Sequence, residues 1–96
     1  MRTIWKADFS VKDEFSVNMP EYSKVLPKVI VQQGVPHLWF LVPNTDAPYI
    51  RRYFHVYGTG NPIGEALHRI NYIDTWEQKI NDEVFVWHLF EEFCEK

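Results

Sequence analysis

The sequence predicts an all-β protein: a single small antiparallel β-sandwich or partly open barrel of about seven strands, with little helix. Apolar and polar residues alternate with a period of two through most of the chain, as they do in half-buried strands. The alternating segments are short, and turn-forming residues separate them. The 96 residues suffice for one hydrophobic core, so we expect residues 1–96 to form one domain.

The first two strands are expected in residues 3–9 and 14–19, where every second residue is apolar. Successive side chains of a strand point to opposite faces, so each segment buries one face and exposes the other. The polar stretch 10–13 between them predicts a hairpin connection. The residues expected to face inward are Trp5, Ala7, Phe9, Phe15, Val17 and Met19.

The third and fourth strands are expected in residues 25–32 and 36–42, on either side of a turn at Gln33-Gly34. Pro27 cannot donate a ladder hydrogen bond, which predicts a sheet edge, a bulge or the entrance of the strand at that point. Residues 36–42 are apolar on both faces, which favours a central strand covered on two sides.

The fifth strand is expected in residues 49–57, after a turn-rich loop at 43–48. Its alternation separates two different faces. One face carries Ile50, Arg52, Phe54 and Val56, and the other carries Arg51, Tyr53, His55 and Tyr57.

The sixth and seventh strands are expected in residues 69–78 and 83–90, joined into a hairpin by a short loop at 79–82. Residues 91–96 fit either an extension of the last strand or a helical turn, and their acidic residues are interpreted as a solvated end. The apolar residues expected in phase in the sixth strand are Ile70, Tyr72 and Trp76.

A glycine-rich stretch follows the fifth strand, with glycines at 58, 60 and 64. This spacing misses the dinucleotide-binding pattern by one residue, and no Gly-Lys-Ser/Thr follows as a P-loop requires. A short helix from Pro62, capped by Asn61, is conceivable but weakened by Gly64. The stretch therefore predicts a structural turn, with Gly58 and Gly60 at positions that need a positive φ or a bulge. Whether it also contacts a ligand stays open.

Catalytic and metal sites are not indicated by the sequence. No serine lies in a nucleophile-elbow pattern, and Cys94 lies among acidic residues that disfavour its thiolate. The histidines show no metal-ligand spacing, and His88 is interpreted as a core or boundary residue. We therefore expect no enzyme activity, no cofactor and no metal. The four histidines are His37, His55, His68 and His88.

Composition sets the class of protein and its surroundings. A net charge of −3 argues against general nucleic-acid binding, which needs a basic patch. The single cysteine excludes an intramolecular disulfide, and no apolar run approaches the ~20 residues of a membrane span. These features predict a cytoplasmic protein that does not bind membranes. Dimerisation through a strand edge or an aromatic patch stays open.

A candidate binding face combines the outer row of the fifth strand with the glycine loop. Tyrosine and arginine are favoured at protein-binding hot spots, and the same row could stack on a small anionic, nucleotide-like ligand. The alternative is an ordinary sheet surface or a part of the core. The candidate binding residues are Arg51, Tyr53, His55, Tyr57, Gly58, Thr59, Gly60 and Asn61.

The sequence resembles a functionally uncharacterised family of short all-β proteins encoded mostly by tailed bacteriophages and their prophages. The segments that carry the resemblance are "IWKADF", "VNMPEYSKVLPKVIVQQGVPHLWFLVPNTDAP", "RRYFHVYGTGNPI" and "VFVWHLFEEF". The segment "GEALHRI" and the C-terminal tail are longer than is usual there. The resemblance implies the fold and a setting in the cytoplasm of an infected bacterium, but no activity.

Three functions agree with these observations. The first is a non-enzymatic, phage-type binding module that inhibits or modulates a host bacterial protein such as a defence-system component. The second is a protein that sequesters a small nucleotide-like signal. The third is a virion-associated structural domain.

Overall fold

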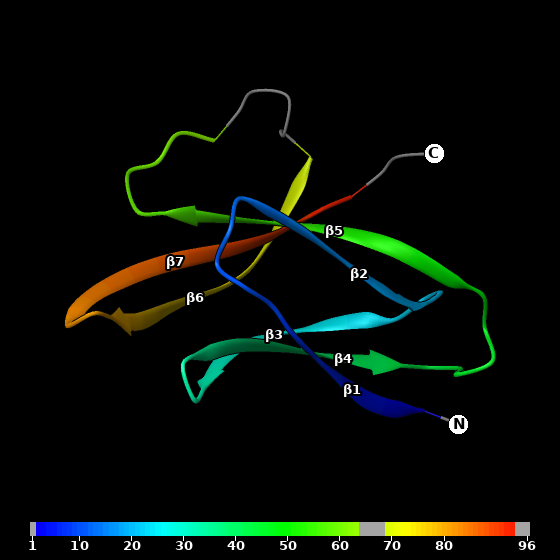
Figure 1. Ribbon diagram of the computed structural model, residues 1–96. Coiled ribbons are helices and arrows are strands. Elements are labelled where there is room, and N and C mark those ends of the chain that lie inside the picture. The colour runs from blue at the N-terminus through cyan, green and yellow to red at the C-terminus, as the bar shows by residue number, and fades with distance from the viewer. Residues whose placement is uncertain (1, 64–68, 94–96) are drawn as a thin grey trace.

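The computed structural model describes residues 2–63 and 69–93, which form seven strands and contain no helix (Figure 1). The all-β prediction is therefore confirmed. The strands are β1 (Thr3–Asp8), β2 (Glu14–Pro20), β3 (Lys24–Gln32), β4 (Val35–Val42), β5 (Tyr49–Gly58), β6 (Ile70–Ile80) and β7 (Glu83–Glu92).

The strands form two antiparallel sheets, one of three strands in the order β1-β4-β3 and one of four in the order β2-β5-β7-β6. In Figure 1 the three-stranded sheet occupies the lower part of the view and the four-stranded sheet the upper part. This is the sandwich-like arrangement that the sequence predicted. No helix in the described part of the chain is long and apolar enough to cross a membrane.

The core lies between the inward faces of the two sheets and is built largely from stacked aromatic rings. Phe9 stacks on Phe15 with ring centroids 4.5 Å apart, and Phe15 stacks on Phe54 at 5.2 Å. Trp76 meets Phe9 edge-on at 5.7 Å. Four further side chains, fully buried, complete the centre of the core, so apolar burial is the main force that holds the sheets together. These are Met19, Leu38, Val42 and Leu89.

The edges of the two sheets adjoin where β3 and β6 each depart from regular pairing. The register of β3 shifts between Val25 and Val29, around Pro27, and that of β6 shifts between Tyr72 and Asp74. The backbone N–H of Val29 donates a hydrogen bond of 2.7 Å to Oδ2 of Asp74. One backbone N–H of edge strand β3 thus has a side-chain partner on edge strand β6. The prediction for Pro27 is confirmed, since it lies at a bulge on an edge strand.

Two of the hairpins have tight turns with a left-handed backbone. Gln33 and Gly34 have φ values of 52° and 79°, as the predicted turn requires. Between β6 and β7 the turn consists only of Asn81 and Asp82, with φ values of 50° and 66°. The predicted loop at 79–82 was therefore too long, because the first two of its residues still pair with β7.

The predicted hairpin between the first two strands is wrong. β1 pairs with β4 and β2 pairs with β5, so residues 9–13 cross from one sheet to the other. The crossing is held at both ends. Phe9 N donates to the carbonyl of Pro36 at 3.0 Å, and Val56 N donates to the carbonyl of Asp13 at 3.2 Å. A polar connection of this length suits a hairpin and a sheet crossing equally well, so the local sequence does not distinguish them.

Two predictions about strand faces also need correction. β4 is central in its sheet as predicted, but its outward residues Trp39 and Leu41 are only partly buried, because the second sheet covers one face. In β6 the bulge reverses the alternation, so that Ile73 is buried while Tyr72 is 58% exposed. Tyr72 is therefore out of phase with Trp76.

Candidate functional site

The solvent side of β5 carries the row of residues that the sequence singled out. Phe54 and Val56 are 0% and 4% exposed and point into the core. Alternation along the strand then places Tyr53, His55 and Tyr57 on the opposite face. The row is thus a feature of the outer surface of the four-stranded sheet.

Neighbouring strands extend this row into an aromatic surface. Across β7, His55 lies opposite Phe90, and across β6, Phe90 lies opposite Tyr72. The ring of Phe90 meets Tyr57 with centroids 5.9 Å apart and Tyr72 at 5.6 Å, both edge-on. We call Tyr53, Tyr57, Tyr72 and Phe90 the outer aromatic face.

His55 is the most buried member of the row, at 4% exposure. Its ring stacks against Tyr57 with centroids 6.3 Å apart. Its Nε2 lies 3.3 Å from Oε2 of Glu92 and 3.9 Å from Oε2 of Glu14. His55, Tyr57 and Glu14, together with Asp13 and Asn61, line a shallow depression of about 440 Å³ on the sheet surface. The depression therefore lies between β2, β5 and the glycine loop.

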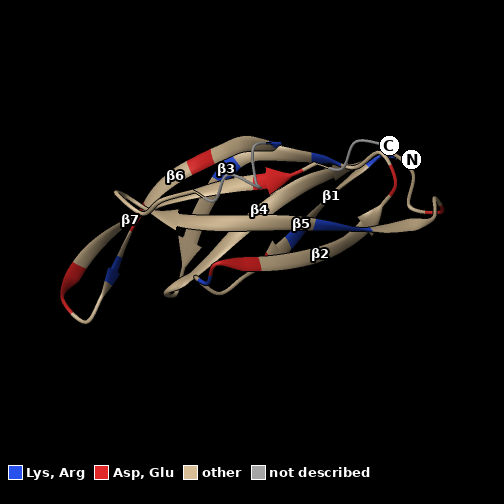
Figure 2. Ribbon diagram, turned by 90° about the horizontal axis from the view of Figure 1, so that it is seen from above, with Lys and Arg blue, Asp and Glu red and all other residues tan. Residues whose placement is uncertain are grey.

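The charge around this depression is negative. Partial burial, and then the carboxylates of Asp13, Glu92 and Glu14, raise the pKa of Tyr57 above its usual value. Burial and nearby anions both raise the pKa of a tyrosine, because both disfavour the charged phenolate. Elsewhere Lys and Arg residues are scattered over several strands and do not form one basic stripe (Figure 2).

The raised pKa of Tyr57 predicts a loss of stability in strong alkali. The unfolded chain releases this proton near pH 10, whereas the folded chain keeps it to higher pH. Unfolding above pH 10 then releases a proton, so the free energy of unfolding should fall as the pH rises. We expect a Tyr57→Phe variant to lose less stability than the wild type between pH 9 and pH 11 in urea titrations. The pKa of Tyr57 itself is obtained from the difference between the tyrosinate absorbance titrations of the folded wild type and the folded variant. A difference that titrates at or below pH 10 would contradict the raised pKa of Tyr57.

The two adjacent arginines have different environments. Arg51 is exposed, and its Nε donates to Oδ1 of Asn18 at 3.5 Å. Arg52 lies on the inner side, where its guanidinium binds both carboxylate oxygens of Glu91 and the carbonyl of Ser23. The acidic residues at 91 and 92 therefore belong to β7 and have partners, which corrects their interpretation as a solvated end. Glu95 and Cys94 lie outside the described residues.

The glycine stretch is a turn, as predicted. Asn61 N donates to the carbonyl of Gly58 at 3.1 Å, and Gly60 has a φ of 89°. Gly58 has no positive φ, contrary to expectation. It pairs regularly with Trp87, and a Cβ there would lie 3.3 Å from the indole ring, so close packing explains this glycine. Gly64 and the conceivable helix after Pro62 lie outside the residues that are described.

The turn is attached to the sheet through His88. Thr59 Oγ1 lies 2.9 Å from Nε2 of His88, and Thr75 Oγ1 lies 2.9 Å from its Nδ1. The hydroxyl of Tyr72 lies 2.7 Å from Thr75 Oγ1 and adds a third hydrogen bond to this network. His88 is thus a boundary residue, as predicted. Thr59, a candidate binding residue, is hydrogen-bonded to the sheet.

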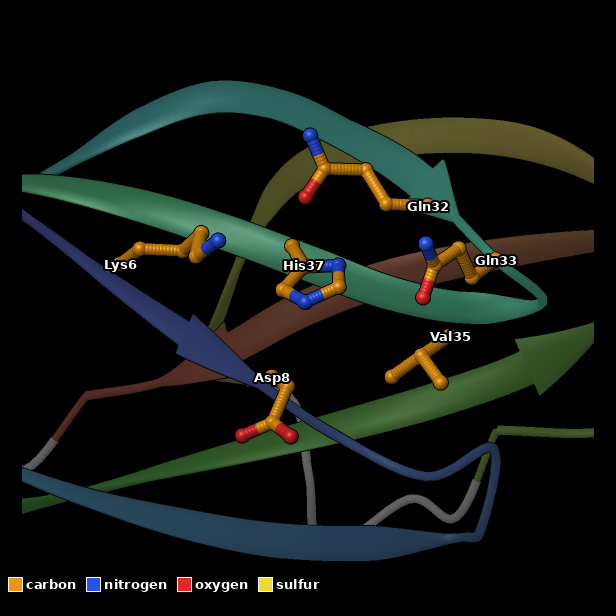
Figure 3. A pocket seen from close by; sticks show the side chains of 6 residues that line it. All are labelled: Lys6, Asp8, Gln32, Gln33, Val35 and His37. Atoms are coloured by element: carbon orange, nitrogen blue, oxygen red, sulfur yellow. The ribbon is translucent and has the colours of Figure 1, made fainter.

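A second depression, of about 560 Å³, lies on the outer face of the three-stranded sheet (Figure 3). Lys6 and Asp8 project from β1, next to His37 on β4. Nδ1 of His37 is buried and has no hydrogen-bond partner among the described residues. The sequence prediction did not include this surface. Of the residues that line this depression, only His37 and Asp8 are common metal ligands, and the others are Lys6, Gln32, Gln33 and Val35.

Comparison with known families identifies the family of this chain. The family described as "Domain of unknown function (DUF7352)" matches residues 1–96, the whole chain. The chain belongs to this family. Comparison with curated proteins and with solved structures found no match. The family description gives no activity, so a function for this family member has to be inferred from the geometry and charge of its surface.

The structure unites some predicted site residues and separates others. His55, Tyr57 and Asn61 line one depression, and Tyr53 lies on the same sheet surface, whereas a Cβ added at Gly60 would meet no atom within 4 Å beyond its chain neighbours. Sequence reasoning missed several residues of this surface, because β2 and β5, and β5 and β7, pair without being consecutive in the sequence. Glu14 could be predicted to face outward by its alternation with Phe15, but its pairing with β5 could not. The missed residues are Asp13, Glu14, Tyr72, His88, Phe90 and Glu92.

Proposed function

We propose that this protein is a non-enzymatic binding module that holds another protein against its outer aromatic face. The observation that supports this most is the position of Tyr53, Tyr57, Tyr72 and Phe90 on the solvent side of the sheet, where the ring of Phe90 contacts those of both Tyr57 and Tyr72. Tyrosine provides a large, rigid contact area and a polar group, which is why it is enriched at hot spots.

The class of partner follows from charge and from the resemblance to phage proteins. Asp13, Glu14 and Glu92 border the aromatic face, and they repel nucleic acids and strongly acidic proteins. We propose a neutral or basic protein surface, and within a phage setting a host bacterial protein such as a defence-system component.

Sequestration of a nucleotide-like anion has less support. Arg52 is engaged by Glu91 and lies on the inner side, which leaves Arg51 as the exposed cation of this row. Catalysis has little support in the described residues as well. Both nitrogens of His88 bond to hydroxyl groups, so no carboxylate orients it as a base toward Thr59.

The proposal is tested by affinity capture from bacterial lysate with matched variants. The test variant is Tyr53→Ala/Tyr57→Ala, and the control is Trp39→Ala on the outer face of the other sheet. We expect a stoichiometric protein partner for wild type and control. The double variant should bind it at least about 30-fold more weakly, as the loss of about 2 kcal/mol at a hot spot implies. Circular dichroism must show that both variants are folded.

Two results would overturn the proposal. One is a partner that the folded double variant binds as tightly as the wild type does. The other is release of a small molecule, without any protein partner, on denaturation of the captured wild type, which would favour sequestration instead.

A further inference from the structure

Three strands of the larger sheet bring one imidazole and two carboxylates together on its outer surface. Glu14 of β2, His55 of β5 and Glu92 of β7 each offer one ligand atom, and these atoms all lie within 4.8 Å of one another. The pair distances from His55 Nε2 are 3.3 Å to Glu92 and 3.9 Å to Glu14. The grouping depends on cross-strand register, since Glu14 lies directly opposite His55.

These distances suit a divalent metal ion. Bonds of about 2.0–2.2 Å place neighbouring ligands of a tetrahedral zinc site about 3.4 Å apart. The distance between His55 and Glu92 already has this value, and that to Glu14 is 0.6 Å longer. The side chain of Glu14 is 58% exposed, so it is free to rotate toward the other two. A small movement of one flexible side chain therefore completes the site.

The histidine is also placed as a ligand would be. Its side chain is 6% exposed, and its Nε2 lies within 4 Å of an oxygen of each carboxylate. In the described part of the chain, Arg52 and Lys79 form ion pairs with Glu91 and Asp82, and not with Asp13, Glu14 or Glu92. The carboxylates therefore concentrate negative charge on a buried imidazole, and a bound cation would neutralise it.

We propose that Glu14, His55 and Glu92 bind a divalent transition-metal ion of the zinc class. One nitrogen and two oxygen ligands suit zinc, cobalt or nickel better than magnesium or calcium, which prefer oxygen ligands alone. Three protein ligands leave a coordination position for water. The ion would tie β2, β5 and β7 together beside Tyr57. This inference goes beyond the proposed protein binding and does not depend on it.

The test is a titration of chelator-treated protein with zinc, cobalt and magnesium. We expect one saturable equivalent of zinc by isothermal titration calorimetry, a zinc-dependent rise in Tm, and no response to magnesium. Bound cobalt should show the intense visible absorption of a four- or five-coordinate site. A Cys94→Ser background removes the thiol as a competing ligand.

Variants locate the site. We expect His55→Gln and Glu92→Gln each to weaken zinc binding by more than about 10-fold, since even second-shell partners contribute 10–100-fold. His37→Gln is the matched control, because His37 also lies near a carboxylate but on the other sheet. If His55→Gln does not fold, the exposed Glu14→Gln serves in its place. Three results would overturn the proposal. The first is the absence of stoichiometric zinc binding, and the second is loss of zinc binding in His37→Gln. The third is a zinc affinity equal to that of the wild type in the folded variants His55→Gln, Glu92→Gln and Glu14→Gln.

Discussion

Replacement of Arg52 by alanine is expected to lower the free energy of unfolding by about 3–5 kcal/mol, the usual cost of breaking a buried ion pair from one side. The Arg52 side chain is 19% exposed and that of Glu91 is 12% exposed. Arg52 binds Glu91 through two parallel contacts, with Nη2 to Oε1 at 2.8 Å, and also binds the carbonyl of Ser23. Its loss leaves a carboxylate and a carbonyl without partners in a largely buried position.

Urea unfolding at neutral pH measures this effect. Arg51→Ala is the matched control, because the neighbouring side chain is exposed and should contribute less than about 0.5 kcal/mol. The double variant Arg52→Met/Glu91→Leu should recover most of the lost stability, since apolar replacement of both partners of a buried pair is often neutral. A similar small loss for Arg51→Ala and Arg52→Ala would show that the ion pair contributes little.

Replacement of Phe54 by alanine should cost about 3–5 kcal/mol, the range for a fully buried phenylalanine. Phe54 is 0% exposed and stacks on Phe15, with centroids 5.2 Å apart and an interplanar angle of 12°. The change removes apolar burial and leaves a cavity where the two sheets meet. It should therefore lower the midpoint of urea unfolding without a change of fold.

Tyr53→Ala is the matched control, one residue away and on the outer aromatic face. It should cost under about 1 kcal/mol, as surface changes usually do, while its effect on partner binding is large if the proposed function holds. Equal destabilisation by Tyr53→Ala and Phe54→Ala would mean that both sides of this strand are buried. The pair of variants thus separates a role in folding from a role in binding.

Local patterns predicted much of the fold correctly. Seven strands follow from period-two alternation, because backbone geometry alone makes successive side chains alternate. The turn at Gln33-Gly34 and the irregularity at Pro27 follow from the φ preferences of glycine and the missing N–H of proline. Each of these properties depends on a residue and its close neighbours in sequence.

The largest failed predictions involve residues that interact over long sequence separations. The bulge that exposes Tyr72 accompanies a hydrogen bond from Val29 to Asp74, 45 residues apart. The adjacent acidic residues at the end of β7 predict a solvated tail. In the structure, however, Glu91 pairs with Arg52, 39 residues away in the sequence. No local pattern indicates such partners.

The sequence by itself determined the strands, most of the residues on their faces and the tyrosine row of the fifth strand, because alternation is a property of a single chain segment. Only the tertiary structure decided that residues 9–13 cross between sheets, and that Glu14, His55 and Glu92 meet on one surface. The physical reason is strand register. Which strands pair, and in which alignment, depends on the joint burial of all seven strands, and a shift of one residue would carry any of these side chains to the other face.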